Sequence, residues 1–153
     1  MADQSTKKKI VLASGVFDLL HLGHVRFLEE AKKAGGENAE LIVVVARDST
    51  VEKTKGRKPI MSENERCLLV ESLKVVDKAV LGYEKFDIDE VIKDINPDVI
   101  ALGYDQQYMI KQVQDYVKKH SSKVKVVRIG KFGENTLDSS SKIKQEIINK
   151  LST

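Results

Sequence analysis

The sequence IVLASGVFDLLHLGH, residues 10–24, joins two different patterns. Its apolar start, Ile10 to Ala13, predicts a buried strand. From Leu22 to Ala31 the apolar residues recur at helical spacing with charged residues between them, which predicts an amphipathic helix. A strand that passes through a turn into a helix leaves backbone N–H groups free at the positive end of the helix dipole. The stretch therefore predicts a phosphate-binding turn.

Two histidines lie in this turn. His21 and His24 are three residues apart, a spacing that lets both imidazoles face one spot, and they are two of the three histidines in the chain. A lone histidine at such a place is most simply a cap or a surface residue. A pair around Gly23, which permits close backbone approach, favours donation by both rings to a single anion.

The rest of the chain alternates strand and helix patterns. We expect strands over residues 41–46, 79–81, 99–102 and 124–129, and helices that begin at Ser62, cover 88–95 and 106–119, and include 143–151. Such alternation predicts a single-domain α/β fold: a Rossmann-like, doubly wound, parallel five-stranded sheet with helices on both faces. We expect this domain over residues 9–153, after a frayed polar tail over 1–8.

Three local features complete the structural expectation. In the helix that begins at Ser62, the inner face should consist of Leu68, Leu69, Val70 and Leu73. In the last helix, the apolar stripe should consist of Ile143, Ile147 and Leu151. Between the second strand and Ser62 we expect a loop with the basic residues Lys53, Lys55, Arg57 and Lys58.

Composition excludes several classes of protein. The chain has 153 residues and a net charge of +3, which is too small to indicate nucleic-acid binding. Its single cysteine, Cys67, excludes an internal disulfide, and its place in an amphipathic pattern predicts a buried, inert thiol. No apolar run reaches the length of about 18 residues that a membrane helix needs. We expect a cytoplasmic protein that binds neither nucleic acid nor membrane.

Polar segments follow other strands besides the first. In a parallel sheet, ligands bind beyond the carboxyl ends of the strands, so these segments should meet at one edge. Each has a simpler alternative: a basic loop can be merely solvated, one serine of 139–141 can be a plain helix cap, Asp105 can cap the next helix, and Phe132 can merely pack.

The stretch GVFDLLHLGH, residues 15–24, resembles the signature Gly-(Thr/Ser)-Phe-Asp-x-x-His-x-Gly-His of the nucleotidylyltransferase superfamily. Its one departure is Val16, where a hydroxyl residue is usual. Residues 138–144, DSSSKIK, resemble the second signature Ile-Ser-(Ser/Thr)-Thr-x-Ile-Arg, with Lys144 in place of arginine, which grips phosphate less specifically. Together with segments 47–66 and 103–106, the resemblance covers nearly the whole chain.

The resemblance implies roles for individual residues. It assigns catalysis to His21, His24 and Lys55. It assigns nucleotide binding to Val16, Phe17, His21, Leu22, Gly23, His24, Asp105, Phe132, Ser140, Ser141 and Lys144. It assigns substrate binding to Asp18, Arg57 and Tyr104, and we expect Arg66 to tie its helix to the basic segment.

Within the superfamily, segments 44–48, 55–60, 76–82 and 102–106 look most like archaeal FAD synthetases. That resemblance implies transfer of AMP from ATP to the phosphate of FMN, with Mg²⁺ carried on ATP rather than held in a metal cage of the protein. The absence of cysteine from residues 133–138, where comparable relatives often have one, keeps glycerol-3-phosphate cytidylyltransferase or another phospho-acceptor enzyme as the alternative. A non-catalytic nucleotide-binding regulator is a second alternative, and a homodimer stays open.

Overall fold

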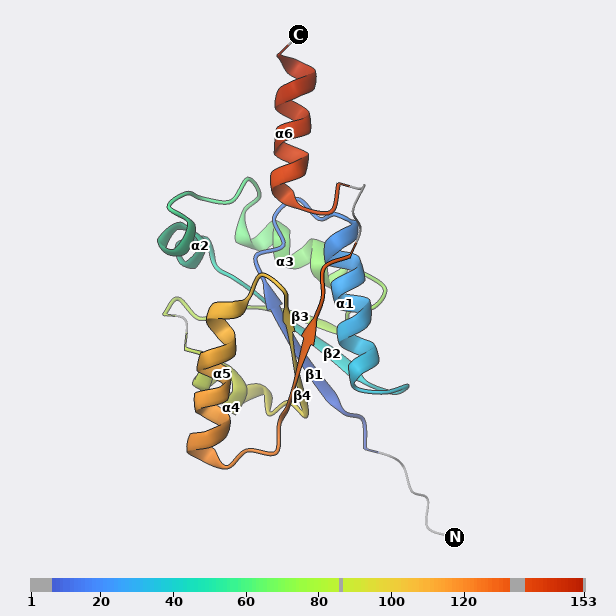
Figure 1. The fold of residues 1–153 in the computed structure, drawn as a ribbon, viewed down its shortest axis with the longest axis vertical. Coiled ribbons are helices and arrows are strands. Elements are labelled where there is room, and N and C mark those ends of the chain that lie inside the picture. The colour runs from blue at the N-terminus through green and yellow to red at the C-terminus, as the bar shows by residue number, and fades with distance from the viewer. Residues whose placement is uncertain (1–6, 86, 133–136, 153) are drawn as a thin grey trace.

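The computed structural model describes residues 7–85, 87–132 and 137–152, and its elements alternate along the chain (Figure 1). The strands are β1 (Ile10–Gly15), β2 (Glu40–Val45), β3 (Lys78–Leu81), β4 (Val99–Gly103) and β5 (Lys125–Ile129). The helices are α1 (Leu22–Ala34), α2 (Asp48–Lys55), α3 (Glu63–Glu71), α4 (Ile88–Ile95), α5 (Gln107–His120) and α6 (Ser140–Leu151). Most of the expected tail, residues 1–6, lies outside the described residues.

All five strands are parallel and lie in the order β3-β2-β1-β4-β5. The central strand β1 pairs on both sides, with Val11 opposite Leu41 of β2 and opposite Val99 of β4. The chain leaves β1 for one neighbour and returns to the other side of it, so the order reverses between β1 and β4. This is the switch point at which such sheets bind ligands.

The side chains of the strands alternate between two cores. Val11, Ala13 and Val43 pack with α1 and α3 on one face, whereas Leu12 and Ile100 pack with α4 and α5 on the other. Strands buried on both faces are apolar throughout, which is why they could be predicted from short apolar runs. The predicted doubly wound α/β fold is confirmed, with strand boundaries that differ by one or two residues.

The predicted basic loop is wrong in its first half. Residues Asp48–Lys55 form the helix α2, which ends at Gly56 in the left-handed conformation (φ 72°). Only Val51 of this helix is buried, so the segment has no apolar stripe that would have indicated a helix. Lys53 and Lys55 therefore stand on a helix, and Arg57 and Lys58 follow its end.

The predicted inner face of α3 is wrong for Leu68 and Leu69, whereas Val70 and Leu73 do pack against the core. Leu68 is 66% exposed and Leu69 is 39% exposed, whereas Arg66 and Val70 are the buried residues of the helix. The spacing from Arg66 to Val70 is one helical turn, so a charged residue takes the place that we expected an aliphatic residue to hold. Cys67 is only partly buried, against the expectation of a buried thiol.

Helix α6 extends away from the sheet, at the opposite end of the molecule from the start of β1 (Figure 1). No residue of α6 is buried, and its expected apolar stripe is largely open, with Leu151 80% exposed. Ile143 is partly buried, whereas Ile147 and Leu151 are left uncovered by the described part of the chain. None of the described helices is both long and apolar enough to cross a membrane.

Candidate functional site

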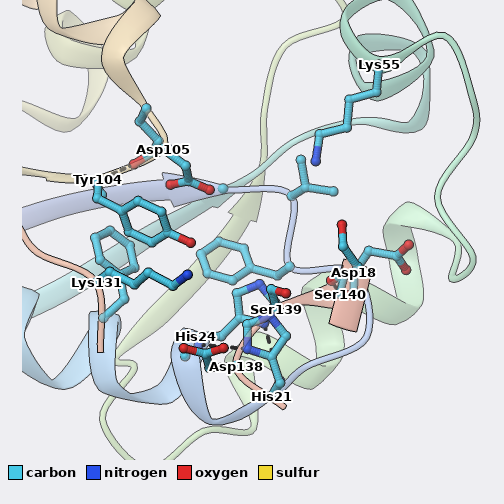
Figure 2. A pocket seen from close by; sticks show the side chains of 18 of the residues that line it. Asp18, His21, His24, Lys55, Tyr104, Asp105, Lys131, Asp138, Ser139 and Ser140 are labelled. Carbon is cyan, nitrogen blue, oxygen red and sulfur yellow. Dashed lines mark hydrogen bonds between the residues drawn. The ribbon is translucent and has the colours of Figure 1, made fainter. Parts of the chain in front are cut away.

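A cavity of about 360 Å³ opens at the carboxyl ends of β1, β4 and β5, below α2 and beside the start of α6 (Figure 2). The fold brings almost all of the predicted site residues to it: Val16, Phe17, Asp18, His21, Gly23, His24, Lys55, Arg57, Tyr104, Asp105, Phe132, Ser140, Ser141 and Lys144. Leu22 does not line the cavity; it is the first residue of α1 and is 46% exposed.

The two histidines cap the start of α1 reciprocally. The Nδ1 atom of His21 accepts from the backbone N–H of His24 at 3.4 Å, and the Nδ1 atom of His24 accepts from the backbone N–H of His21 at 3.3 Å. The rings stack with centroids 3.7 Å apart. Because each Nδ1 acts as an acceptor, we assign the proton of each neutral ring to Nε2. The pair thus keeps two Nε2–H donors, because the cap uses only the Nδ1 acceptors.

Both histidines favour the neutral form. Burial lowers the pKa of His21, and the nearby carboxylate of Asp138 opposes that shift. Burial, followed by the proximity of His21, lowers the pKa of His24 to about 3, with Lys55 also contributing. Neutral rings near pH 7 keep the assigned tautomer, because a protonated Nδ1 could no longer accept from the backbone. The site therefore offers neutral donors rather than imidazolium charges.

The backbone of the turn between β1 and α1 adopts uncommon conformations. Phe17 and Leu19 have φ values of 55° and 54°, in the left-handed region that bulky residues rarely occupy. Phe17 is buried, and its ring lies 5.3 Å from the ring of His24. A Cβ atom on Gly23 would lie 2.4 Å from the carbonyl oxygen of Asp138, so only glycine lets the segment before α6 lie across the start of α1.

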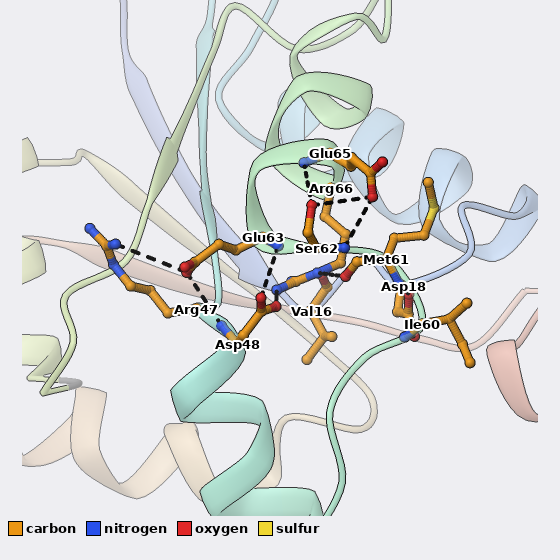
Figure 3. Close-up of polar contacts among 10 residues, drawn as sticks. All are labelled: Val16, Asp18, Arg47, Asp48, Ile60, Met61, Ser62, Glu63, Glu65 and Arg66. Carbon is orange, nitrogen blue, oxygen red and sulfur yellow. Dashed lines mark hydrogen bonds and ion pairs between the residues drawn. The ribbon is translucent and has the colours of Figure 1, made fainter.

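Arg66 of α3 holds the turn in place (Figure 3). Its guanidinium is completely buried, donates to the carbonyl oxygen of Val16 at 2.7 Å and pairs with the carboxylate of Asp48 at 2.7 Å. Its Nε atom donates to the carbonyl oxygen of Met61 at 3.0 Å. The expectation that Arg66 ties α3 to the preceding segment is confirmed, and the same side chain also reaches the signature turn.

Asp18 joins the turn to the segment before α3. Its carboxylate is buried and accepts from the backbone N–H groups of Ile60 at 2.8 Å and Met61 at 3.0 Å. Both carboxylate oxygens are thus used within the protein, and they position the end of the basic segment. A contact between Asp18 and a substrate stays a prediction.

The start of α6 forms another part of the wall. Ser139 is its N-cap and accepts from the backbone N–H of Lys142, as expected for one serine of the run. Ser140 donates to the carbonyl oxygen of Asp18. The ammonium of Lys144 lies 4.0 Å from the carboxylate of Asp18. Residues 138–144 of the second signature therefore contact residues 15–24 of the first, and the N-terminus of α6 lies at the cavity.

Aromatic and basic side chains line the end of the cavity formed by β4 and β5. The ammonium of Lys131 lies 5.8 Å from the centre of the Tyr104 ring. Burial, followed by the charges of Asp105 and Asp138, raises the pKa of Tyr104. Phe132 lines the same end. These flat faces can receive the ring of a base or another planar group.

The sequence reasoning missed two residues of this end. Lys131 points into the cavity (Figure 2), and its place directly after a strand was the available signal. Gln106 is buried; it accepts from the backbone N–H of Gly103 at 2.8 Å and donates to the carbonyl oxygen of Ser14 at 2.9 Å, so it joins β4 to β1. The alternative that Asp105 caps α5 is wrong, because Gln106 holds the N-cap position.

The described residues contain no group of three or more His, Cys, Asp or Glu side chains arranged to hold a metal ion. Three carboxylates line the cavity, those of Asp18, Asp105 and Asp138, and Asp18 already accepts two backbone hydrogen bonds. This donor set fits a divalent metal ion that is bound mainly by the phosphates of a ligand.

Comparison with known proteins shows the family of the chain. A family model described as cytidylyltransferase-like matches residues 12–146. A protein of Aciduliprofundum boonei named FAD synthase is 51% identical over 92% of this chain and 91% of its own. One of Methanobrevibacter smithii with the same name is 50% identical over 91% and 90%. A crystal structure from Thermoplasma volcanium, titled lipopolysaccharide core biosynthesis protein, is 47% identical over 82% of this chain and 98% of that one, with a TM-score of 0.73.

Proposed function

Because the chain belongs to the cytidylyltransferase-like family, we propose that it is a nucleotidyltransferase that moves AMP from ATP to the phosphate of FMN, giving FAD and pyrophosphate. The relatives named FAD synthase, which match nine-tenths of the chain at about half identity, support FMN as acceptor and ATP as donor. Except for Leu22, the residues implicated by the family resemblance line one cavity at the switch point of the sheet, where such a reaction requires them.

One observation carries the proposal: the reciprocal cap between His21 and His24. A pure cap needs one acceptor side chain, and serine or aspartate is the common choice. Here each imidazole accepts from the backbone N–H of the other histidine, and each retains an Nε2–H donor at the positive end of α1. Two preorganised donors at one point suit the α-phosphate, where negative charge increases in the transition state.

The proposed reaction needs no covalent intermediate on the protein. A phosphate oxygen of FMN attacks the α-phosphorus of ATP, a new P–O bond forms, and the bond from the α-phosphorus to the bridging oxygen breaks in line with it. His21 and His24 donate to the nonbridging α-phosphate oxygens, and Lys55 adds positive potential from above. The pyrophosphate leaves toward Ser141, Lys144 and the N-terminus of α6. Catalysis then consists of positioning and charge stabilisation, as in phosphoryl transfer generally.

We propose that the divalent ion is Mg²⁺ and that it arrives on ATP. It would supply charge neutralisation to the triphosphate, and Asp105 is the cavity carboxylate best placed to contribute a ligand, since it makes no ion pair in the described chain. Lys55, Lys131 and Lys144 provide the protein's own share of positive charge at the two polyanions.

Product analysis tests the proposal directly. Incubation with FMN, ATP and Mg²⁺ should yield FAD and pyrophosphate in equal amounts, measured by chromatography and by a phosphate assay after pyrophosphatase treatment. The same protein is incubated with CTP and glycerol 3-phosphate, and with ATP and phosphopantetheine. CDP-glycerol without FAD would favour the cytidylyltransferase alternative. ATP binding without pyrophosphate release from any acceptor would favour the regulator.

A further inference from the structure

Asp138 has a buried carboxylate oxygen that pairs with no other group in the described part of the chain. Its side chain is only 2% exposed and lines the cavity. One oxygen, Oδ1, accepts from the ammonium of Lys142 at 2.6 Å. The other, Oδ2, is buried and has no hydrogen-bond partner in the described part of the chain. An ionised oxygen without a donor is unfavourable in a low-dielectric place, so a native structure that keeps one usually has a reason outside the contacts of the free protein.

The charges around Asp138 keep it ionised. The hydrogen bond from Lys142 lowers the pKa of this carboxyl, and the charge of Lys131 contributes in the same direction. An ionised carboxylate only accepts hydrogen bonds, so Oδ2 can be satisfied only by an N–H or O–H donor or by a cation.

The position of Asp138 indicates which part of a ligand it meets. Its backbone lies against Gly23 at the start of α1, and its charge acts on His21 on one side and on Tyr104 on the other. Figure 2 shows it beside the histidine pair, with Lys131 and Tyr104 above. It thus stands between the place proposed for the α-phosphate and the aromatic end of the cavity. A triphosphate that spans these two places carries its nucleoside part past Asp138.

We propose that Asp138 recognises the nucleoside part of the bound triphosphate, with Oδ2 accepting a hydrogen bond from a ribose hydroxyl or from the exocyclic amine of the base. This assignment rests on the proposed function and adds a specificity-determining residue to it. Phosphate oxygens are not the partner, because they carry negative charge and no proton. An acceptor that is already buried and oriented favours a ligand that supplies the donor and rejects an analogue that lacks it.

Analogues of ATP identify the donor. We measure the KM values for ATP, 2′-deoxy-ATP, 3′-deoxy-ATP and purine riboside triphosphate, which lacks the 6-amino group, together with their Kd values by calorimetry without FMN. One of the three analogues should bind about 10- to 100-fold more weakly than ATP, since a lost hydrogen bond to a charged group is of that order. The analogue that loses affinity shows whether the hydroxyls or the amine are the source. Equal affinity for ATP and all three analogues would overturn the proposal.

The variant Asp138→Asn provides a second test of the proposal. Its amide oxygen can still accept from Lys142, which places the NH₂ group where Oδ2 was, so shape and ion-pair partner are retained but the acceptor is lost. We expect weaker ATP binding by the same factor, an unchanged KM for FMN, and no further loss with the discriminated analogue. If Asp138→Asn weakens ATP and all analogues equally, or leaves the Kd for ATP unchanged, Asp138 makes no such contact.

A matched variant separates recognition from structure. Lys142→Gln removes the ion pair but leaves the Asp138 carboxylate, so it should retain the discrimination between ATP and the analogue. The proposal would be contradicted if Lys142→Gln no longer distinguished ATP from the analogue while Asp138→Asn still did. Because the calorimetric arm needs no turnover, its result stands even if the wild-type protein makes no FAD, in which case only the proposed function fails.

Discussion

The cavity has two walls that are held in different ways. On one, His21 and His24 are bound to the backbone and to each other at the start of α1. On the other, Lys55, Arg57 and Lys58 are exposed and make no hydrogen bond or ion pair within the described chain. The first, which we call the rigid wall, is neutral and fixed by hydrogen bonds. The second, which we call the mobile wall, is charged and is not fixed by a partner in the described chain.

This difference separates two tasks. Donors that are already oriented stabilise a transition state without reorganising, which is the larger source of rate enhancement. Long exposed cations lose more conformational freedom when they bind, and salt screens them, so they suit the capture of anionic ligands more than the chemical step. Variants of the rigid wall should therefore affect stability and kcat, and variants of the mobile wall should affect KM and its dependence on salt.

The largest effect should come from the support of the rigid wall. Arg66→Lys keeps the charge but cannot reach Val16, Met61 and Asp48 together. Leaving buried partners unsatisfied should lower the free energy of unfolding by about 3–5 kcal/mol, measured by urea denaturation. The control is Arg26→Lys, whose exposed pair with Glu29 should be worth less than about 0.5 kcal/mol. Equal stability of the two variants would mean that Arg66 does not support the turn.

The next-largest effect concerns His21, and its substitution by asparagine or by glutamine separates its role as a helix cap from its role as a donor. His21→Asn keeps an acceptor near the position of Nδ1, and hence the cap, but loses the Nε2–H donor. It should keep its stability and lose about 10²–10³ in kcat. His21→Gln places an amide N–H near the position of Nε2 but is a poorer cap, so it should lose about 1 kcal/mol of stability and less rate. The reverse order of rates would contradict the assigned tautomer.

These predictions depend on features that the sequence reveals unequally. The strands, the doubly wound sheet and the signature turn follow from apolar runs and from one motif, because local patterns encode them. Helix α2 was missed because a polar helix with Val51 as its sole buried residue has no periodicity to detect. Arg66 at the inner face of α3 was not foreseen as the buried residue there, because its three partners come from other segments. The unpaired oxygen of Asp138 depends on how one loop crosses Gly23, which no local pattern specifies.

A smaller effect should come from the mobile wall. Lys55→Ala should raise the KM for at least one of the two anionic substrates about 10-fold, with a smaller change in kcat, because the ammonium attracts phosphate from an exposed position. The effect should shrink as the salt concentration rises from 50 to 500 mM. The control is Lys53→Ala on the same helix, since Lys53 does not line the cavity. Similar KM values for the two variants would show that Lys55 does not contribute to substrate binding.

The last effect is a pH dependence of stability that belongs to the rigid wall. The pKa of His24 is about 3 in the folded protein, against about 6.5 in an unfolded chain. Between these values the unfolded chain binds the additional proton, so the stability contributed by the neutral ring is complete above pH 6.5 and is lost as the pH falls toward 3. The slope for one such proton is at most about 1.4 kcal/mol per pH unit.

Urea denaturation at pH 7.0, 6.0 and 5.0 tests this dependence. The free energy of unfolding should fall more steeply with pH in the wild-type protein than in His24→Asn, because asparagine does not titrate. If the free energy of unfolding of His24→Asn fell with pH as steeply as that of the wild type, His24 would have the same pKa in the folded and unfolded states. The assignment of a neutral histidine pair would then be wrong.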